Sequence, residues 1–523
     1  MEKRLLINED YIMLPICPGK KEILLEMFLE EADGLTKVME WMVPIGEIEG
    51  NDYAYTYKAT IPVKAWKGKK LVLMGKVPEQ FFEEVDNTSF FHISKDTEEY
   101  RPSIHFTANT GWINDPNGLV YSEGKYHLYF QYNPCNTSWQ NMSWGHAVSS
   151  DLLHWEEQEI ELIPDEHGMM FSGCGLRNEQ GLLGLPKEAL LFFYTAAGDK
   201  KPWGKERHFT QRVAYSLEQG KNLIKLPEPC LEEIKEESRD PKIFWHEESK
   251  AYIMVLWIEA NDFGIFRSNN LKDWKMSSKV TLQDAWECPD LMRLYDEEGK
   301  ENWLFWSADG FYFWGDFDGY EFKTDGKKHL AYMNKLAYAA QTYSGVEGRT
   351  ISIPWLRTEN RGKLYTGAMG IPREFSVRVI DREKYLVQKP IRELISQRKL
   401  IEERKLGSSK SYEVMAYEYH SIESGKAVQV EMQLDEQYTD IIIWQLNGTS
   451  ISYNPINGLF LVNEEAFDIG KRRKQFTFLI DGNIFEVNVD RDIMTGIFEL
   501  REDCVEICTD MKGIEQFSIY EIL

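Results

Sequence analysis

Three carboxylic acids stand out because the sequence fixes each of them in a tight turn or beside an aromatic residue. Asp115 lies in GWINDPNG, Asp240 lies in RDPK, and Glu287 lies in WECPD. Carboxyl groups constrained in this way are candidates for nucleophilic and for general acid–base catalysis. These three residues are therefore our candidate catalytic groups.

The three acids differ in how readily a purely structural role accounts for them. Asp-Pro and Asn-Gly are both turn-forming pairs, so Asp115 can serve as a hydrogen-bonded turn aspartate. Asp240 can form a local ion pair with Arg239 ahead of the strand-like run KIFW. Glu287 lies between Trp286 and the CysPro pair, and contact with apolar surface favours the protonated form of a carboxyl group. A general acid requires that form.

Motifs for other kinds of chemistry are missing from the sequence. It contains no Gly-rich phosphate loop, no His-Glu-x-x-His helix and no paired Cys-x-x-Cys motif. Cys504-x-x-x-Cys508 has no accompanying histidines at ligand spacing. We therefore expect no metal site and no other cofactor.

Composition limits the partners and the compartment. The 523 residues include 60 Lys and Arg against 85 Asp and Glu, a net charge of −25, so most of the surface should repel nucleic acid. No run approaches about 18 apolar residues, the length that a membrane-spanning helix needs. Seven cysteines are scattered without a disulfide pattern, and the acidic N-terminus lacks the apolar core of an export signal. We expect a cytoplasmic protein that binds neither nucleic acid nor membrane.

Short runs rich in aromatic and β-branched residues predict a mostly β structure. Aromatic residues make up 13% of the chain and fall in runs such as KYHLYFQY from Lys125 and AYIMVLWI from Ala251. The pattern S-x-x-L-x-x-W occurs at Ser149–Trp155 and again at Ser268–Trp274, after a strand-like run in each case. Repeated strand units favour a β-propeller, although a plain β-sandwich stays open on this pattern alone.

Composition divides the chain into three parts, in line with a length of 523 residues. Residues 1–95 alternate short strands with turns and predict a small N-terminal β-domain, followed by the polar linker Ser94–Ser103. Residues 104–375 hold nearly all of the Trp-rich and acid-bearing motifs. Beyond the charged run Gln397–Ser411, the pattern predicts a further all-β domain over residues 400–523.

Seven motifs follow one another in a specific order. They are WINDPNG (Trp112–Gly118), FQYNP (Phe130–Pro134), WGHAVSSDLLHW (Trp144–Trp155), FSG (Phe171–Gly173), RDPK (Arg239–Lys242), ECPDL (Glu287–Leu291) and GDFDG (Gly315–Gly319). In this order they resemble glycoside hydrolase family 32, the β-fructosidases that include invertases, inulinases, levanases and sucrose-6-phosphate hydrolases. The resemblance covers residues 104–375, and FLIDGNIFEV from Phe478 weakly resembles the β-sandwich of this family.

The resemblance implies a fold and a set of roles. The fold is all-β, with a five-bladed β-propeller catalytic domain followed by a β-sandwich, here behind the small N-terminal β-domain. Asp115 would be the nucleophile, Glu287 the acid/base and Asp240 the stabiliser of the transition state. A retaining glycosidase places its two working carboxyl groups about 5–5.5 Å apart. The sugar pocket would be lined by Asn114, Gln131, Trp139, Phe171, Ser172, Arg239 and Trp355.

Two of these pocket residues have another interpretation. Trp139 could pack in the core of a Trp-rich blade, as most tryptophans in such a fold do. Gln131 lies in a strand whose alternation could point its side chain to solvent. For both residues only the family resemblance indicates the pocket.

These features predict a retaining exo-β-fructosidase that hydrolyses terminal β-fructofuranosyl units of sucrose and short fructo-oligosaccharides by a double displacement. A sucrose-6-phosphate hydrolase is one alternative, because Lys200, Lys201, Lys205 and Arg207 form a basic loop that could bind phosphate. A fructosyltransferase shares the first chemical step and stays open. A non-catalytic sugar-binding propeller would lack at least one of the three acids. The preferred sugar, the oligomeric state and the role of the first domain stay open as well.

Overall fold

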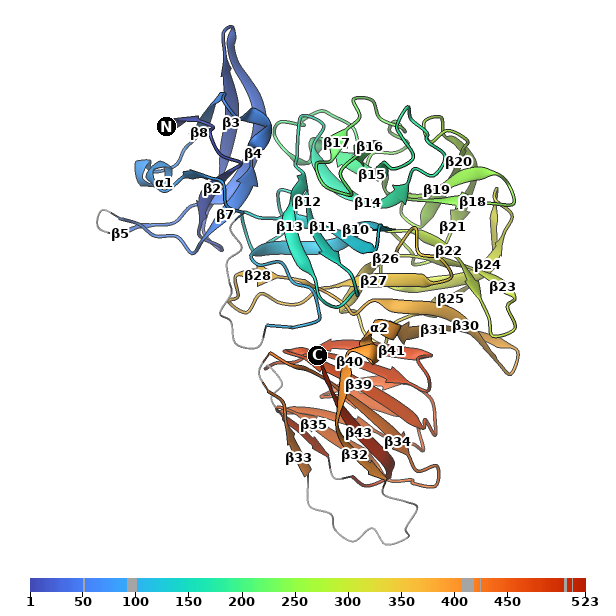
Figure 1. The fold of residues 1–523 in the computed structure, drawn as a ribbon. Coiled ribbons are helices and arrows are strands. Elements are labelled where there is room, and N and C mark those ends of the chain that lie inside the picture. Colours follow the sequence, from blue (N-terminus) through green and yellow to red (C-terminus); the bar gives the residue numbers. More distant parts are fainter. Residues whose placement is uncertain (50–51, 92–100, 406–417, 424, 503–505, 510) are drawn as a thin grey trace.

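The computed structural model describes residues 1–49, 52–91, 101–405, 418–423, 425–502, 506–509 and 511–523. Within these ranges nearly all regular structure is β-strand, with two short α-helices, α1 (Glu79–Glu83) and α2 (Arg392–Ser396). The strands form three bodies that follow one another along the chain (Figure 1). No helix in the described part of the chain is long and apolar enough to cross a membrane.

The N-terminal body contains a four-stranded and a three-stranded antiparallel sheet. The first consists of β1 (Glu2–Leu6), β8 (Lys70–Gly75), β3 (Glu22–Glu31) and β4 (Gly34–Pro44), and the second of β7 (Tyr57–Pro62), β2 (Tyr11–Ile16) and β9 (Asp86–Thr88). In β3 the buried residues Leu25, Met27 and Leu29 alternate with more exposed ones. This period of two places one apolar face of the strand against the core.

Five sheets form the propeller, and the fold predicted from the sequence is confirmed. In each sheet the first strand along the chain is the inner one, and the following strands lie further out. The first blade contains β10 (Gly111–Ser122), β11 (Lys125–Asn133), β12 (Ser143–Ser149) and β13 (Glu156–Leu162), and the second contains β14 (Met169–Arg177), β15 (Leu190–Ala197), β16 (Thr210–Ser216) and β17 (Ile224–Lys225). The third contains β18 (Arg239–His246), β19 (Ala251–Glu259), β20 (Asp262–Ser268) and β21 (Lys275–Thr281), and the fourth contains β22 (Asp290–Tyr295), β23 (Glu301–Trp306), β24 (Phe311–Phe317) and β25 (Phe322–Leu330). The fifth contains β26 (Ala337–Thr342), β27 (Thr350–Leu356), β29 (Ala368–Met369), β30 (Arg373–Ile380) and β31 (Glu383–Pro390).

The ring is closed by a segment from beyond the fifth inner strand. Strand β28 (Tyr365–Thr366) pairs in parallel with the start of β10, so a late part of the chain completes the first blade. The inner strand β10 also packs against the inner strands β14 and β26 on its two sides. The inner strands therefore surround one central axis (Figure 1).

The S-x-x-L-x-x-W repeat marks equivalent turns in two blades. It joins the third and fourth strands of the first blade and of the third blade. Leu152 and Leu271 are fully buried and both have positive φ, at 66° and 61°. The serine before each of them, Ser149 or Ser268, accepts hydrogen bonds from the backbone of the turn. The repeat is therefore a turn signal that the hydroxyl group stabilises.

The third body is a β-sandwich of two six-stranded sheets. One sheet consists of β32 (Arg398–Lys405), β43 (Ile514–Ile522), β34 (Ala427–Leu434), β39 (Gln475–Asp481), β40 (Ile484–Val489) and β41 (Met494–Glu499). The other consists of β33 (Glu418–Ser421), β42 (Glu506–Thr509), β35 (Ile442–Leu446), β36 (Thr449–Tyr453), β37 (Leu459–Val462) and β38 (Glu465–Asp468). Aromatic residues such as Trp444, Phe476 and Phe478 fill the space between the two sheets.

The predicted end of the propeller domain, at residue 375, differs from the extent of its sheets. Strands β30 and β31 pair along their whole length as one hairpin, which reaches Pro390. The predicted range ended at residue 375 because the Trp-rich and acid-bearing motifs end before this hairpin. The structure places the boundary between Pro390 and the start of β32 at Arg398.

A buried ionic cluster joins the start of the propeller to the sandwich. His105 is 1% exposed, and its ring nitrogens lie 2.9 Å from Asp481 Oδ2 and 3.1 Å from Glu486 Oε1. Burial alone would lower the pKa of His105, but the hydrogen bonds to the two carboxylates outweigh it and raise this pKa to about 9. Arg373 of the fifth blade also pairs with Glu486. We call His105, Arg373, Asp481 and Glu486 the interdomain cluster.

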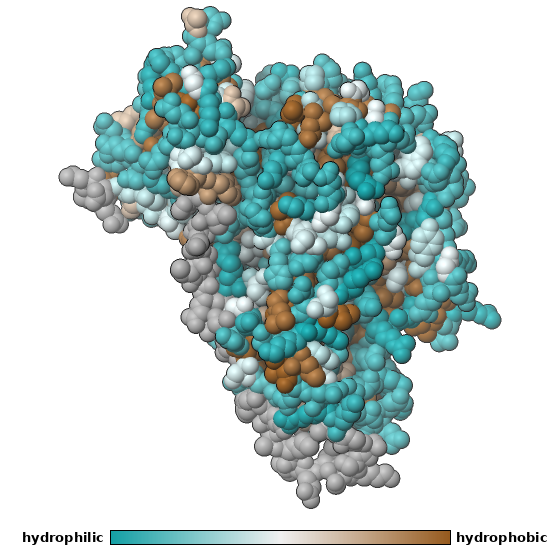
Figure 2. Space-filling view, viewed as in Figure 1, coloured by the Kyte–Doolittle hydropathy of each residue, from teal (hydrophilic) through white to brown (hydrophobic). Residues whose placement is uncertain are grey.

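The visible face of the molecule is predominantly hydrophilic, with scattered apolar patches over all three bodies (Figure 2). This matches the excess of 85 acidic over 60 basic residues. Apolar atoms are common on the surfaces of soluble proteins, so the patches alone indicate no partner.

Candidate active site

A cavity of about 490 Å³ lies where the inner strands of the propeller converge. All ten residues predicted for the site line it, together with four that were not predicted. The lining consists of Asn114, Asp115, Gln131, Trp139, Phe171, Ser172, Lys200, Phe209, Glu237, Arg239, Asp240, Glu287, Tyr338 and Trp355. Its volume falls in the range of small-ligand pockets, roughly 300–1,000 Å³.

The local backbone explains how three blades aim their acids at one cavity. Asp115 lies near the start of β10, Asp240 near the start of β18, and Glu287 in the turn just before β22. The strand register is irregular at Asp115 and again at Asp240. Asp240, Glu287 and Cys288 have positive φ values of 66°, 47° and 41°. Such backbone conformations cost about 1–3 kcal/mol each, and they cluster at functional sites.

Asp115 is held by a short chain of donors. Ser172 Oγ donates to Asp115 Oδ2 at 2.6 Å, and Asn114 Nδ2 donates to Oδ1 at 3.2 Å. The Trp112 indole nitrogen donates to Asn114 Oδ1 at 3.0 Å and so fixes the amide orientation. Burial raises the pKa of Asp115, the hydrogen bond from Ser172 opposes this, and the neighbouring charge of Glu287 raises it further.

Asp240 is the most deeply enclosed of the three acids, with 4% of its surface exposed. Its carboxylate accepts the backbone N–H of Cys288 at 3.0 Å, and its own N–H donates to Thr195 Oγ1 at 3.1 Å. Burial raises the pKa of Asp240 to about 7; Arg239 counteracts this, whereas the charges of Glu287 and Asp115 add to it.

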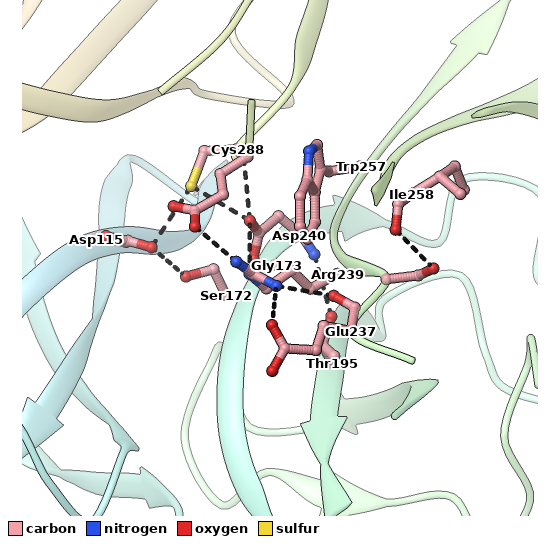
Figure 3. A network of polar contacts seen from close by, with 12 residues as sticks. Asp115, Ser172, Gly173, Thr195, Glu237, Arg239, Asp240, Trp257, Ile258 and Cys288 are labelled. Atoms are coloured by element: carbon pink, nitrogen blue, oxygen red, sulfur yellow. Dashed lines mark hydrogen bonds and ion pairs between the residues drawn. The ribbon is translucent and has the colours of Figure 1, made fainter. Parts of the chain in front are cut away.

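The Cys288 thiol connects the two aspartates. Its Sγ lies 3.5 Å from Asp115 Oδ2 and 3.5 Å from Asp240 Oδ2, within sulfur hydrogen-bond distance of both (Figure 3). Burial and the surrounding carboxylates raise the pKa of this thiol far above its usual range, so it stays protonated and can act as a donor. Sequence reasoning noted Cys288 only as part of a motif.

Glu287 is held by polar groups, and Trp286, which was expected to supply apolar surface beside it, is largely exposed. Arg239 Nη2 lies 2.6 Å from Glu287 Oε1, and the Tyr338 hydroxyl donates to Oε2 at 2.8 Å. Trp286 is instead 46% exposed and donates to Asp309 at 2.9 Å.

Gln131 and Trp139, the two predicted pocket residues for which a structural role was also considered, both line the cavity. Gln131 is 2% exposed, and its Nε2 donates to the backbone oxygen of Met170 at 2.8 Å. Trp139 is 46% exposed and lies edge-on to Phe171, with ring centroids 6.1 Å apart. Trp139 therefore forms part of the rim, where an open aromatic face is available to a sugar ring.

Three lining residues, Phe209, Glu237 and Tyr338, were missed from the sequence, and Lys200 was considered only as part of a basic loop that could bind phosphate. A signal existed for two of them. Glu237 lies two residues before Arg239 and is bridged to it, with Arg239 Nη1 3.5 Å from Glu237 Oε2. Tyr338 lies directly opposite Trp355 in the β26–β27 pair. Lys200 and Phe209 bound a long connection between β15 and β16, and nothing in the sequence pattern places that connection.

The raised pKa of Asp240 predicts a pH-dependent stability difference. An unfolded aspartate loses its proton near pH 4 and folded Asp240 near pH 7. As the pH rises from 4 to 7, the unfolded chain ionises first and the wild-type protein loses stability. Asp240→Asn does not titrate, so it should become more stable than the wild type by roughly 2–4 kcal/mol above pH 7.

Urea unfolding at pH 5 and pH 8 measures this difference. Asp33→Asn, in an exposed turn of the N-terminal body, is the matched control and should show the wild-type dependence on pH. If Asp240→Asn gains no stability relative to the wild type between pH 5 and pH 8, Asp240 does not hold a proton in the folded protein near neutrality.

The fold and the site together define a five-bladed propeller with an acidic, sugar-sized pocket on its axis. Residues 105–390 match the family model for the N-terminal domain of the glycosyl hydrolases of family 32, which is more than half of the chain. The protein therefore belongs to glycosyl hydrolase family 32. This confirms the family resemblance of the motifs.

Individual relatives are about one third identical to the chain over the aligned segments. A levanase of Bacillus subtilis is 33% identical over 335 residues, which cover 57% of this chain and 48% of the levanase. An invertase of Debaryomyces hansenii is 36% identical over 296 residues, covering 51% of this chain and 54% of the invertase. The chain thus spans about half the length of these two relatives.

Solved structures extend the likeness beyond the propeller. An exo-inulinase of Aspergillus awamori superposes with a TM-score of 0.72 at 25% identity, covering 83% of this chain and 99% of the inulinase. A family 32 glycoside hydrolase of Bifidobacterium adolescentis has a TM-score of 0.67 at 19% identity and covers 99% of this chain and 98% of its own. At that identity the second match shows the fold alone, including a body before the propeller.

Proposed function

We propose that the protein is a retaining exo-β-fructosidase that releases terminal β-fructofuranosyl units from sucrose and short fructo-oligosaccharides. The observation that carries the proposal is the meeting of Asp115, Asp240 and Glu287 in one cavity of about 490 Å³. The names of similar proteins, which are a levanase, an invertase and an exo-inulinase, also support the proposal.

In the proposed reaction the three acids have separate tasks. Asp115 attacks the anomeric carbon and forms a fructosyl ester, while Glu287 gives a proton to the departing glycosidic oxygen. Glu287 then takes a proton from water as that water cleaves the ester, which restores both groups. Asp240 contacts the sugar hydroxyls, and its raised pKa lets it donate as well as accept a hydrogen bond near neutral pH.

The enclosure of the acids supports attack on a terminal sugar unit. Asp240 is 4% and Gln131 2% exposed, whereas Trp139 is 46% exposed. A sugar held by the first two side chains has its other end at the rim that Trp139 forms. An internal unit of a polymer would need space for chain on both sides.

The basic loop supports an uncharged substrate over a phosphorylated one. Lys200 Nζ pairs with Glu237 Oε1 at 2.5 Å, which offsets its charge. Lys201 is 3% exposed and donates to the backbone oxygen of Glu40 at 2.7 Å, away from the cavity lining. Of the four cations considered for a phosphate site, Lys200 is thus paired with an acid inside the cavity lining, and Lys201 is bonded outside it. A fructosyltransferase differs only in the acceptor of the second step, and product analysis separates it.

Product analysis tests the proposal. The protein is incubated with sucrose, 1-kestose, inulin, levan and sucrose 6-phosphate, and the released sugars are resolved by chromatography. We expect fructose as the first monosaccharide from 1-kestose, with sucrose accumulating transiently. In the presence of methanol, a retaining enzyme should form methyl β-D-fructofuranoside.

Three outcomes would contradict parts of the proposal. Early release of intermediate oligosaccharides from inulin or levan would show endo-action. Much faster cleavage of sucrose 6-phosphate than of sucrose would favour the phosphate alternative. Accumulation of longer oligosaccharides from sucrose would show a transferase.

A further inference from the structure

The N-terminal body contacts two loops of the propeller that both carry pocket residues. The first, residues 198–209, connects β15 to β16 and includes Lys200 and Phe209. The second, residues 134–142, connects β11 to β12 and includes Trp139. Strands β3 and β4 of the N-terminal body form a hairpin beside the first two blades (Figure 1).

Glu40 of β4 anchors the first loop. It is 1% exposed although it is a carboxylate, and its Oε1 accepts the backbone N–H of Trp203 at 3.0 Å. Its backbone oxygen accepts Lys201 Nζ at 2.7 Å, and that ammonium group also lies 5.4 Å from the centre of the Trp41 ring. The other carboxylate oxygen of Glu40 pairs with Lys37 at 2.8 Å. Both the main chain and a side chain of the loop are therefore fixed by one strand.

The first loop is tightly packed between its contacts with Glu40 and its residues at the pocket. A Cβ atom on Gly204 would lie only 2.0 Å from the backbone oxygen of Gly198, so the two segments touch through glycine. At the pocket end, Lys200 pairs with Glu237 and lies 5.6 Å from the centre of the Phe209 ring. Trp203, which Glu40 holds, and Lys200, which lines the pocket, therefore belong to one closely packed loop.

The second loop is anchored by the same hairpin. The Asn141 side chain bonds to both backbone groups of Met42, at 2.9 Å in each case, as a neighbouring strand would. Asn136 Nδ2 donates to Glu22 Oε1 at 2.7 Å. These two asparagines flank Trp139 on the rim.

A chain of ion pairs connects the proposed acid, Glu287, to the anchored rim. Glu287, the proposed acid, pairs with Arg239 at 2.6 Å, and Arg239 lies 3.5 Å from Glu237. Glu237 in turn pairs with Lys200. This chain of charges leads from the group that protonates the leaving oxygen to the first loop.

We propose that the N-terminal body is a structural part of the sugar site. Glu40 acts as a positioning residue that holds the first loop, and through Lys200 and Glu237 it shapes the place of an uncharged leaving-group sugar. The innermost fructosyl unit is contacted by propeller residues alone. This inference rests on the proposed fructosidase function.

Glu40→Ala tests the inference, with two companion variants. Loss of one buried hydrogen bond is worth about 1 kcal/mol, so KM for sucrose should rise about fivefold while kcat stays within about twofold. The inhibition constant of free fructose should not change. Glu40→Gln keeps an acceptor for the Trp203 N–H and should restore the wild-type KM. Asn87→Ala removes hydrogen bonds inside the N-terminal body, so it should lower stability without changing KM.

Hydrogen exchange of peptides from residues 198–209 provides a readout that does not depend on activity. Exchange should be faster in Glu40→Ala than in the wild type and in Asn87→Ala. Unchanged exchange would overturn the inference, even if the protein hydrolysed none of the fructosides. Conversely, an active wild type with equal rises in KM for Glu40→Ala and Asn87→Ala would leave the proposed function standing and refute the role of Glu40.

Discussion

Asp115→Asn is expected to lower kcat on sucrose by roughly 10⁴-fold, about 5 kcal/mol of transition-state stabilisation. The amide has the size of the carboxylate but cannot form the fructosyl ester. Its oxygen can still accept the hydrogen bond that Ser172 Oγ now gives to Asp115 at 2.6 Å. The fold and the affinity for sucrose should therefore survive, and initial rates together with calorimetric titration measure both.

The surface variant Asp33→Asn, prepared in the same way, is the control for loss of activity during handling. Turnover of Asp115→Asn within tenfold of the wild type would remove Asp115 from the role of nucleophile. Loss of sucrose binding together with turnover would point to a binding role instead.

Glu287→Gln is expected to slow sucrose hydrolysis by about 10²–10⁴-fold, the contribution typical of general acid–base catalysis. The effect should depend on the leaving group. With 4-nitrophenyl β-D-fructofuranoside, whose phenolate departs without a proton, the first step should stay fast and a burst of nitrophenol should precede slow turnover. Stopped-flow absorbance measures the burst.

Azide distinguishes the two catalytic roles further. A small anionic nucleophile needs no base, so azide should accelerate breakdown of the fructosyl ester in Glu287→Gln and yield a β-fructosyl azide. Asp115→Asn, which forms no ester, should give no such product. An equal loss of rate on sucrose and on the nitrophenyl substrate, without a burst, would show that Glu287 is not the acid.

The sequence indicated these acids because their motifs combine several local signals. Turn-forming pairs around Asp115 and the arginine beside Asp240 are visible in the chain itself. The S-x-x-L-x-x-W repeat likewise indicated blades, because a serine that stabilises a turn and a buried leucine are local features. What surrounds each acid in space was harder to infer.

The interactions that were missed or wrongly assigned depend on backbone direction and on distant segments. Trp286 seemed to cover Glu287, but the Trp286 indole donates to Asp309 and the Glu287 carboxylate pairs with Arg239. Lys200 lines the cavity from a loop whose Lys201 and Trp203 bond to Glu40, which is 160 residues before Lys200 in the chain. No local pattern reports a contact of that kind. The residues that the family motifs indicated all line one cavity, and such motifs carry spatial information that no local pattern contains.

The interdomain cluster has a consequence for attempts to treat the sandwich as an exchangeable module. Asp481 accepts the backbone N–H groups of Ser103, Ile104 and His105, all from the segment that enters the propeller. A sandwich transplanted alone would present two carboxylates, Asp481 and Glu486, that have lost the cations compensating their burial. Uncompensated buried charge costs several kcal/mol. A chimera that exchanges the sandwich must therefore carry the matching histidine and arginine with it.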